Sequence, residues 1–295
     1  MFYRRKVLLA LLELFNNNLE KIQLQKLLLL FCQMQQKPVY HFVPYKYGCF
    51  SFQANADLAT LTKSGIIKSG ERNYEKISNE FFFNLLTSQD KNYLEELRNS
   101  YSGLTSEELI RATYLKFPYY AIKSKILNKV LSEEEIPAVV QYLPKNNNEI
   151  TLYTIGYEGL SLEEYLNKLL ENNVKVLCDV RKNSFSMKYG FSKSQLQHAC
   201  EGLNIVFLHL PNLGIESASR KNLNTQKDRD SLFDEYCRNT LPNVTLDVNN
   251  IISFLRKYQK VALTCFESLS CECHRSHLAL EVLRLANYEF KVVHL

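Results

Sequence analysis

Residues 150–295 alternate between short apolar segments that favour strands and amphipathic segments that favour helices. The strand patterns cover 151–156, 174–180, 205–210, 261–266 and 290–295. The helical patterns cover 161–172, 192–202, 228–239, 248–258 and 274–287. Such alternation is typical of β-α-β units, which build a parallel sheet with helices on both faces. We therefore predict an α/β fold for residues 149–295: a Rossmann-like domain with a doubly wound, mainly parallel sheet.

The chain has 295 residues, about twice the length of a typical domain of roughly 150 residues. A proline and an asparagine run within 143–149 end a helical region just before the first strand pattern. We place the main boundary there. The sequence thus predicts a winged-helix-like domain at 1–80, a helical extension at 81–148 and the Rossmann-like domain at 149–295.

The winged-helix prediction rests on three helical patterns followed by a hairpin. The helices are expected at 3–15, 21–33 and 52–63, and two β-prone pieces flank Ser69-Gly70 within 66–77. The stretch Tyr45-Lys-Tyr-Gly-Cys-Phe-Ser51, with the Asp57-Leu58 and Gly65-Ile66 pairs after it, resembles the signature of bacterial winged-helix modules related to the Panacea, or SocA-like, antitoxin domain. This resemblance implies a module that docks on DNA or on a protein.

The net charge of +5 is unevenly distributed. Residues 1–148 hold 19 basic and 14 acidic side chains, whereas residues 149–295 hold 17 of each. The surplus has two interpretations: ordinary surface variation, or a nucleic-acid-facing module joined to a neutral one. In the second case we expect the phosphate contacts to be Lys46, Lys63, Lys68, Arg72 and Lys76. In the first case the same region is a solvated wing and a protein-contact surface.

Composition and hydropathy exclude several classes of protein. Hydrophobic residues make up 46% of the chain, too many for a disordered protein, and eight cysteines are too few for a disulfide scaffold. No apolar run reaches the roughly 18 to 20 residues of a membrane span. The basic N-terminus precedes an apolar stretch, but Glu13 interrupts it and no signal-peptide cleavage site follows. We expect a cytoplasmic protein with no membrane partner.

Chemically versatile residues follow the predicted strands of the second half. In parallel sheets, functional groups collect beyond the carboxyl ends of the strands. We expect an anion site there, with Arg181, His274 and Arg275 near a helix start. The expected substrate-binding residues are Gly156, Tyr157, Arg181, His209, Cys273, His274 and Arg275, and the expected catalytic residues are Glu267, Cys265 and Asp179. The alternative is that Asp179 pairs with Arg181 or Arg275 in a buried network that braces the sheet edge.

The same motifs carry a second resemblance. The segments in question are Thr154 to Gly159, Asp179 to Arg181, Phe191-Ser192, Leu208 to Gly214, Cys265 to Glu267, Cys273 to Arg275 and Val293-His294. In order and spacing they are similar to the domain-of-unknown-function 488 family, over about residues 151–295. The resemblance implies a fold and a shared site, but no established reaction.

Cysteine chemistry leaves three interpretations open. Cys265, Cys271, Cys273, His274 and His277 are enough ligands for zinc, but the usual paired spacing of zinc ligands is absent. A nucleophilic Cys265 or Cys273 would have its thiolate favoured by Arg275 and the helix start, with Glu267 or His274 as proton-transfer partner. Cysteine as core packing is the third. Our prediction includes no metal ligand and no cofactor.

The functional hypothesis combines both halves. We expect a cytoplasmic two-module protein that acts on or binds a nucleic acid or an anionic, nucleotide-like small molecule, with a winged helix for docking on DNA or a protein partner. Whether it is an enzyme stays open. The alternatives are a non-enzymatic regulator that senses an anion, and an interaction module of a toxin-antitoxin or phage-defence system. The substrate and the oligomeric state do not follow from the sequence.

Overall fold

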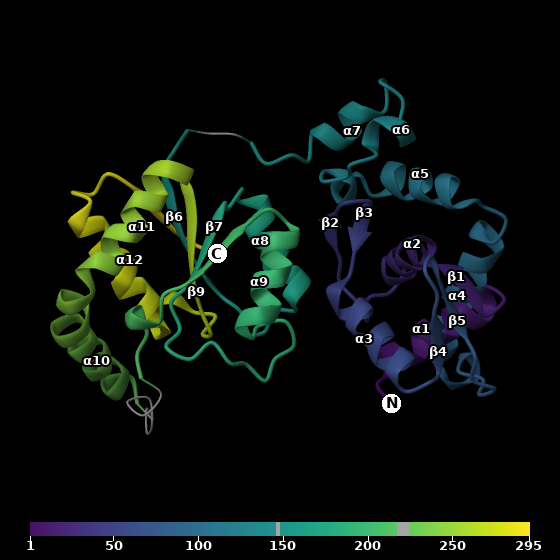
Figure 1. Ribbon diagram of the computed structural model, residues 1–295, viewed down its shortest axis with the longest axis horizontal. Coiled ribbons are helices and arrows are strands. Elements are labelled where there is room, and N and C mark those ends of the chain that lie inside the picture. Colours follow the sequence, from purple (N-terminus) through teal and green to yellow (C-terminus); the bar gives the residue numbers. More distant parts are fainter. Residues whose placement is uncertain (146–147, 217–224) are drawn as a thin grey trace. The chain divides into compact units, whose positions relative to one another are not determined.

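A computed structural model describes residues 1–145, 148–216 and 225–295. The chain divides into two compact units, 1–143 and 144–295 (Figure 1). Among the helices within the described ranges, none is both long and apolar enough to cross a membrane.

The N-terminal unit begins with alternating helices and short strands. In chain order these are α1 (Tyr3–Leu14), β1 (Asn18–Glu20), α2 (Lys21–Cys32), β2 (Val43–Tyr45), β3 (Gly48–Phe50), α3 (Phe52–Lys63), β4 (Ile67–Ser69) and β5 (Asn73–Lys76). The predicted hairpin is confirmed, because β4 pairs with β5 in antiparallel register and β1 extends the sheet in the order β1-β5-β4. The similarity to antitoxin-related winged helices stays a prediction.

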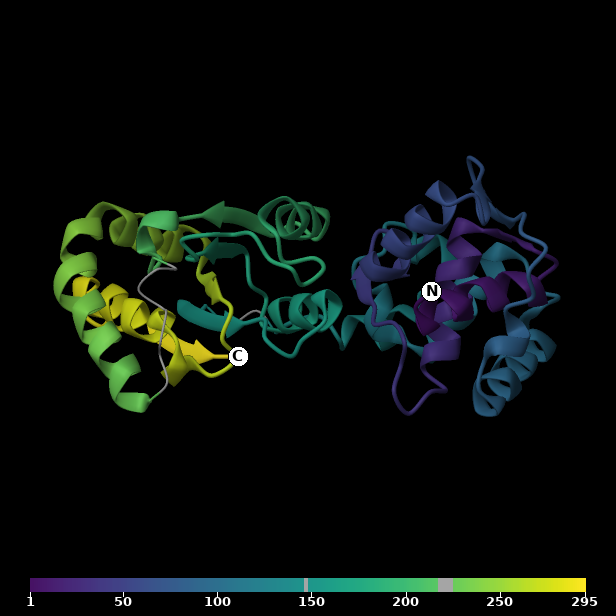
Figure 2. The ribbon, with the colours of Figure 1, turned by 90° about the horizontal axis from the view of Figure 1, so that it is seen from below.

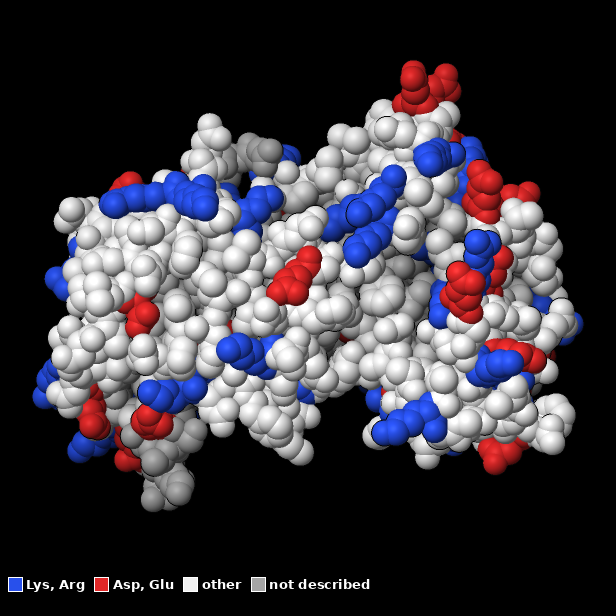
Figure 3. All heavy atoms as spheres, viewed as in Figure 1, with Lys and Arg blue, Asp and Glu red and all other residues white. Residues whose placement is uncertain are grey.

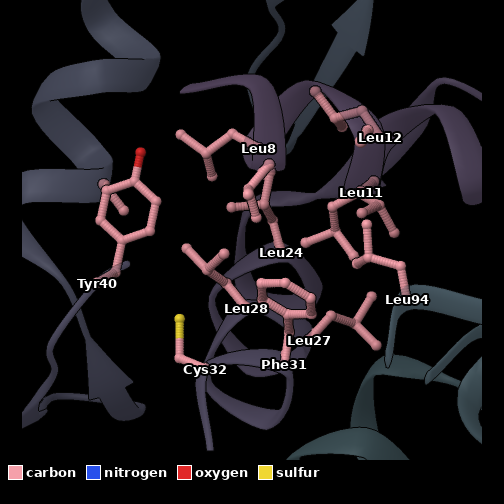
Figure 4. Close-up of a cluster of buried hydrophobic side chains, with 14 of the residues drawn as sticks. Leu8, Leu11, Leu12, Leu24, Leu27, Leu28, Phe31, Cys32, Tyr40 and Leu94 are labelled. Atoms are coloured by element: carbon pink, nitrogen blue, oxygen red, sulfur yellow. The ribbon is translucent and has the colours of Figure 1, made fainter. Parts of the chain in front are cut away.

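Leucines of α1 and α2 form the centre of this unit (Figure 4). Helical spacing places Leu8 and Leu12 of α1 towards Leu24 and Leu28 of α2, and all four are fully buried. Burying a leucine side chain contributes about 1.5–3 kcal/mol, so this cluster is the main source of the unit's stability.

The segment that follows packs into the same core. Its elements are η1 (Phe83–Leu85), α4 (Ser88–Tyr101), α5 (Ser106–Lys116), η2 (Pro118–Ala121), α6 (Leu127–Val130) and α7 (Ile136–Val140). Leu94 of α4, seen at the edge of Figure 4, and Leu109 of α5 belong to the leucine cluster. Between η2 and α6 the helical extension is interrupted: the Ser124 hydroxyl bonds to Tyr114 and accepts a hydrogen bond from the Ile126 amide, which competes with helical hydrogen bonding.

The C-terminal unit has the predicted alternation of strands and helices. Its elements are β6 (Thr151–Gly156), α8 (Leu162–Glu171), β7 (Val176–Asp179), α9 (Lys193–Gly202), β8 (Val206–His209), η3 (Pro211–Leu213), α10 (Gln226–Glu235), η5 (Tyr236–Thr240), η6 (Leu241–Val244), α11 (Thr245–Tyr258), β9 (Lys260–Cys265), η7 (Ser270–Glu272), α12 (His274–Leu285) and β10 (Lys291–His294). All five strands are parallel, in the order β10-β6-β9-β7-β8. The predicted Rossmann-like sheet is confirmed.

Helices cover both faces of this sheet. Helices α8 and α9 lie on one face, and α11 and α12 lie on the other (Figures 1 and 2). Every residue of β6 and β9 is buried, which is why these two segments read as nearly continuous apolar runs. The helices therefore leave the ends of the central strands as the place where polar groups can gather.

The strand register brings four predicted site residues to one edge. Gly156 of β6 lies opposite Cys265 of β9, and Asp179 of β7 lies opposite His209 of β8. Each is the last residue of its strand. The loops that follow these strands therefore leave the sheet together at its carboxyl edge.

Candidate functional site

Asp179 and Arg181 form a buried, two-pronged ion pair. The Arg181 Nε donates to one carboxylate oxygen of Asp179 at 2.8 Å, and the second donor, Nη2, reaches the other oxygen at 2.6 Å. The remaining nitrogen, Nη1, donates to the Tyr157 hydroxyl at 2.8 Å. Burial disfavours the guanidinium charge, but the bonds and charge of Asp179 outweigh this effect and raise the pKa of Arg181. All three nitrogens of Arg181 are engaged within the protein.

Neighbouring groups fix this pair in place. The Tyr157 ring stacks on Phe191 with centroids 4.3 Å apart, and the His209 Nε2 lies 3.0 Å from the Arg181 carbonyl oxygen. Since a carbonyl only accepts, His209 is the donor. These contacts hold the loop after β7 against the loop after β6. They involve Tyr157, Arg181 and His209, which the sequence predicts as substrate contacts.

Arg275 holds the loop that follows β9. Its side chain is 1% exposed, Nη1 donates to the Glu267 carbonyl, and Nη2 donates to the Ser268 carbonyl at 2.8 Å. Among the described residues, its Nε has no hydrogen-bond partner. Arg275 therefore positions a loop, and its contact with an anion stays a prediction.

Gly156 lets the same loop approach the end of β6. A Cβ atom at this position would lie only 1.8 Å from the Glu267 carbonyl oxygen. The amides of Tyr157 and Glu158 donate to the Phe266 carbonyl at 3.1 and 2.9 Å, which joins the two loops directly. Gly156 thus serves close packing between loops, and it fixes where Cys265 and Glu267 lie.

A cluster of two thiols, an imidazole and a carboxylate lies among these loops. The His274 Nδ1 lies 3.7 Å from the Cys273 Sγ and 3.9 Å from the Cys265 Sγ. The Cys265 Sγ also donates to a carboxylate oxygen of Glu267 at 3.2 Å. Cys265, Cys273 and His274 are at most 1% exposed, whereas Glu267 is half-buried and gives the cluster its contact with solvent.

The electrostatics of the cluster oppose negative charge on the thiols. Burial is the main cause that raises the pKa of Cys273 well above its usual range, and the nearby Cys265 and Glu267 raise it further. Arg275 acts in the opposite direction but does not reverse the shift. Without an added cation, Cys273 is therefore a neutral thiol at neutral pH.

The structure also separates the cysteine alternatives. Cys271 is exposed in η7, and His277 lies against the Phe233 ring with centroids 4.9 Å apart. Within the described residues, Cys265, Cys273 and His274 are the only group whose ligand atoms could together hold a metal ion. Of the five ligands suggested by the sequence, three converge.

Sequence reasoning missed two neighbours of His274. The Val180 carbonyl oxygen lies 3.2 Å from its Nε2, and the Tyr236 ring meets the imidazole edge-on with centroids 5.4 Å apart. Val180 lies within the Asp179 to Arg181 motif, so its position after a buried strand was a usable signal. Tyr236 lies in an irregular helical turn, and nothing in its local sequence pointed to the site.

A cavity of about 250 Å³ has Tyr236 in its lining. Lys182 and Gly214, from the loops after β7 and β8, line it together with Leu232 and Glu235 of α10. Lys182 forms an exposed pair with Glu216 at 3.0 Å. This cavity and the Cys-His cluster therefore share one aromatic wall.

The five predicted phosphate contacts of the N-terminal unit differ in their exposure to solvent. Lys46, Lys63, Lys68 and Arg72 are exposed. Lys76 is only 8% exposed, donates to the Ser78 carbonyl at 2.6 Å and pairs with Glu13 at 3.3 Å. Lys76 is therefore part of the packing between β5 and α1. On the face drawn in Figure 3, basic and acidic side chains alternate over the N-terminal unit.

Comparison with known proteins identifies part of the chain. No curated protein and no solved structure matches it. Residues 161–282 match the family model described as "Domain of unknown function DUF488". The matched range includes α8 to most of α12, and with it Asp179, Arg181, Cys265, Glu267 and the Cys273-His274-Arg275 motif. The family resemblance of the C-terminal half is thus confirmed over residues 161–282, and the description of this family states no function.

Proposed function

We propose that the C-terminal unit binds a nucleotide-like or nucleic-acid anion at the carboxyl edge of its sheet, and that Cys265, Glu267 and His274 carry the chemistry there. One observation supports this most strongly. A thiol lies 3.2 Å from a carboxylate and 3.9 Å from an imidazole, at the edge where parallel sheets place their functional groups. A nucleophile with proton-transfer partners in reach is a recurring arrangement in group-transfer sites.

The roles of the surrounding residues follow from their contacts. Asp179 and Arg181 satisfy each other, so they act by positioning the loops and not by touching ligand. Glu267 is the half-buried member of the cluster, so it is the first of these groups that an incoming ligand meets. We assign it the role of accepting or returning a proton, with Cys265 as the attacking group.

Two lysines supply positive charge beside the cluster. Lys188 donates to the Tyr157 carbonyl at 2.9 Å and remains partly exposed, and Lys182 lines the neighbouring cavity. Burial lowers the pKa of Lys188, while Glu164 and Glu158 oppose that shift. These side chains replace Arg181 and Arg275 as the proposed contacts for an anion.

The binding test uses the full chain at low salt. Nucleoside 5′-monophosphates and a mixed-sequence single-stranded DNA oligonucleotide are titrated calorimetrically. We expect Lys182→Met and Lys188→Met each to weaken binding by about tenfold, as for loss of one charged contact. The control is Lys257→Met, at an exposed position on α11. No binding of any probe, or equal weakening by the control, would reject the proposal.

The chemical role has a separate test. Each probe that binds is incubated with the protein, and products are followed by mass spectrometry. Glu267→Gln should abolish turnover while binding persists, and Cys265→Ser should abolish turnover. A ligand that binds without turnover in the wild type would instead favour the sensing regulator.

For the N-terminal unit we propose docking on DNA through the exposed Lys46, Lys63, Lys68 and Arg72. Removing any one of these phosphate-binding side chains should reduce the salt dependence of binding by about one unit of slope. Duplex-DNA binding by the full chain is therefore measured over a salt series for Lys68→Ala and Arg72→Ala, with Lys129→Ala on α6 as control. Undetectable binding at low salt would leave a protein partner as the occupant of this surface.

A further inference from the structure

The Cys265, Cys273 and His274 ligand atoms lie within 4.8 Å of one another at the sheet edge. They come from two places in the chain: Cys265 is the last residue of β9, whereas Cys273 is the N-cap of α12 and His274 is its first residue. The loop between them is held by Arg275 through the Glu267 and Ser268 carbonyls. Two separate pieces of backbone are thus fixed so that three soft or borderline ligands face one point.

The spacing of these atoms fits a tetrahedral metal ion. Zinc binds sulfur at about 2.3 Å and imidazole nitrogen at about 2.0–2.1 Å, so a tetrahedral site separates sulfur from nitrogen by about 3.6 Å. The two sulfur-to-nitrogen distances here are 3.7 and 3.9 Å. Both sulfur-to-nitrogen distances are therefore within a few tenths of an ångström of the value that a tetrahedral zinc ion requires.

The orientation of His274 has the same implication. Its Nε2 lies 3.2 Å from the Val180 carbonyl oxygen, which can only accept, so Nε2 carries the proton and Nδ1 presents its lone pair to the sulfur atoms. Metal-binding histidines commonly fix their ring in this way, with the second nitrogen donating to a carbonyl. The Tyr236 ring, edge-on to the imidazole, limits its rotation.

We propose that Cys265, Cys273 and His274 bind a zinc ion, with a fourth position on the Glu267 side open to water or to an anionic ligand. On binding, the two thiols lose their protons to solvent, and both thiolates and the neutral imidazole coordinate the ion. Three protein ligands with one open position are typical of zinc sites that act on a ligand. Thiolate and imidazole ligands favour zinc over magnesium or calcium.

This inference rests on the proposed binding of an anion at the sheet edge and deepens it. With zinc bound, Cys265 is a metal ligand, so the attacking group is a water in the open position and not this thiol. Lys182 and Lys188 supply positive charge near the sheet edge, whereas Arg181 is engaged by Asp179 and Tyr157, and Arg275 by two carbonyls. A zinc ion at this site, its charge balanced by the two thiolates, offers the anion a direct bond at the open coordination position. It also gives a reason for two buried thiols to lie together, because a bound cation stabilises their ionised forms.

The experiment measures metal in the full chain, purified without chelators. Elemental analysis should find one zinc per chain in the wild type, and Cys265→Ser and Cys273→Ser should each lose it. Cys271→Ser is the matched control, since this exposed cysteine lies two residues before Cys273. It should keep the full zinc content. Circular dichroism establishes that each variant is folded.

A second measurement uses only the wild type, so it does not depend on how the variants fold. The chain is stripped with a chelator, and Co²⁺ or Zn²⁺ is then added. Co²⁺ should give the visible absorption of a tetrahedral thiolate site. Zn²⁺ should protect Cys265 and Cys273, but not Cys271, from alkylation mapped by mass spectrometry, and should raise the thermal midpoint.

Three results would overturn the zinc site: no metal bound before or after reconstitution, a disulfide between Cys265 and Cys273 in the purified protein, or equal loss of zinc in Cys271→Ser. These readouts need no nucleotide. Zinc binding without any nucleotide or DNA binding would reject the proposed function alone, whereas ligand binding by a protein without zinc would reject the zinc site alone.

Discussion

Both units bury charged side chains, but they distribute them differently. In the N-terminal unit the buried charges lie apart, each with its own partners. Lys26 donates to the Tyr47 carbonyl, and Asp57 accepts from Arg4, Arg5 and the Tyr40 hydroxyl. In the C-terminal unit Asp179, Arg181, His274, Arg275 and two thiols gather along one edge of the sheet.

The difference arises from topology. A parallel sheet brings the ends of successive strands to the same edge, so polar residues far apart in sequence meet there. The helices and short antiparallel strands of the N-terminal unit have no such common edge. A buried charge in that unit ties two elements together, whereas Asp179, Arg181 and Arg275 of the C-terminal unit position loops around reactive groups.

Removal of Asp179 should have the largest effect. Asp179→Ala leaves Arg181 buried without its partner and should lower the free energy of unfolding by about 4 kcal/mol. Glu216→Ala, which breaks the exposed pair with Lys182, should cost about 0.5 kcal/mol or less. Urea denaturation followed by circular dichroism measures both. Similar costs for the two variants would mean that the sheet edge does not depend on its ion pair.

Gly156→Ala tests the close approach of the loops. The added Cβ would overlap the Glu267 carbonyl, and we expect a cost of about 3 kcal/mol, with loss of the cysteine and histidine geometry. Gly159→Ala is the matched control: its φ is +80° and no atom lies near its Cβ, so strain alone should cost about 1 kcal/mol. Equal effects would show that the loop moves aside without penalty.

Asp57→Ala removes a buried carboxylate of the N-terminal unit, which lies apart from the other buried charges there. It removes four hydrogen bonds, but the Arg4 and Arg5 side chains are 29% and 22% exposed and can turn towards water. We expect a loss of about 2 kcal/mol, smaller than for Asp179. Hydrogen exchange should locate the loss in the N-terminal unit, with protection in β6 and β9 unchanged. A larger cost than for Asp179→Ala would contradict the comparison.

The smallest effect is a pH dependence from Lys26. Burial lowers the pKa of this lysine, while the facing Cys49 thiol opposes the shift. The unfolded chain then binds the proton more tightly, so stability relative to Lys26→Met should rise with pH up to the ordinary lysine pKa, by at most about 1.4 kcal/mol per pH unit. Urea denaturation of both proteins between neutral pH and about pH 9.5 measures this difference. A flat or falling difference would exclude a depressed pKa.

Much of the C-terminal fold could be predicted because strand and helix patterns repeat along the chain. The five strand segments are present, and the strand-end motifs meet as expected. The roles of single residues were harder to predict. Arg181 and Arg275 look alike in sequence as anion contacts, yet neighbouring carboxylate and carbonyl oxygens engage both, and only tertiary packing determines which oxygens lie in reach.

The N-terminal unit shows the same limit. Lys68 and Lys76 both lie in the predicted hairpin, two basic residues of similar appearance. Strand β5 pairs with β1 and also contacts α1. Lys76 of β5 is therefore buried against Glu13 of α1, whereas Lys68 of β4 is exposed. Solvation of a long side chain depends on which element covers it, and the local sequence does not record that.

The sequence by itself determined the alternation that makes a parallel sheet, the family of its C-terminal half and the residues at the strand ends. These follow from local periodicity and from motif order. Only the tertiary structure decided that Cys265, Cys273 and His274 converge while Cys271 and His277 lie elsewhere. The physical reason is that ligand geometry is set by strand register and by the two loops that Gly156 and Arg275 hold together, and these contacts join segments that lie far apart in the sequence.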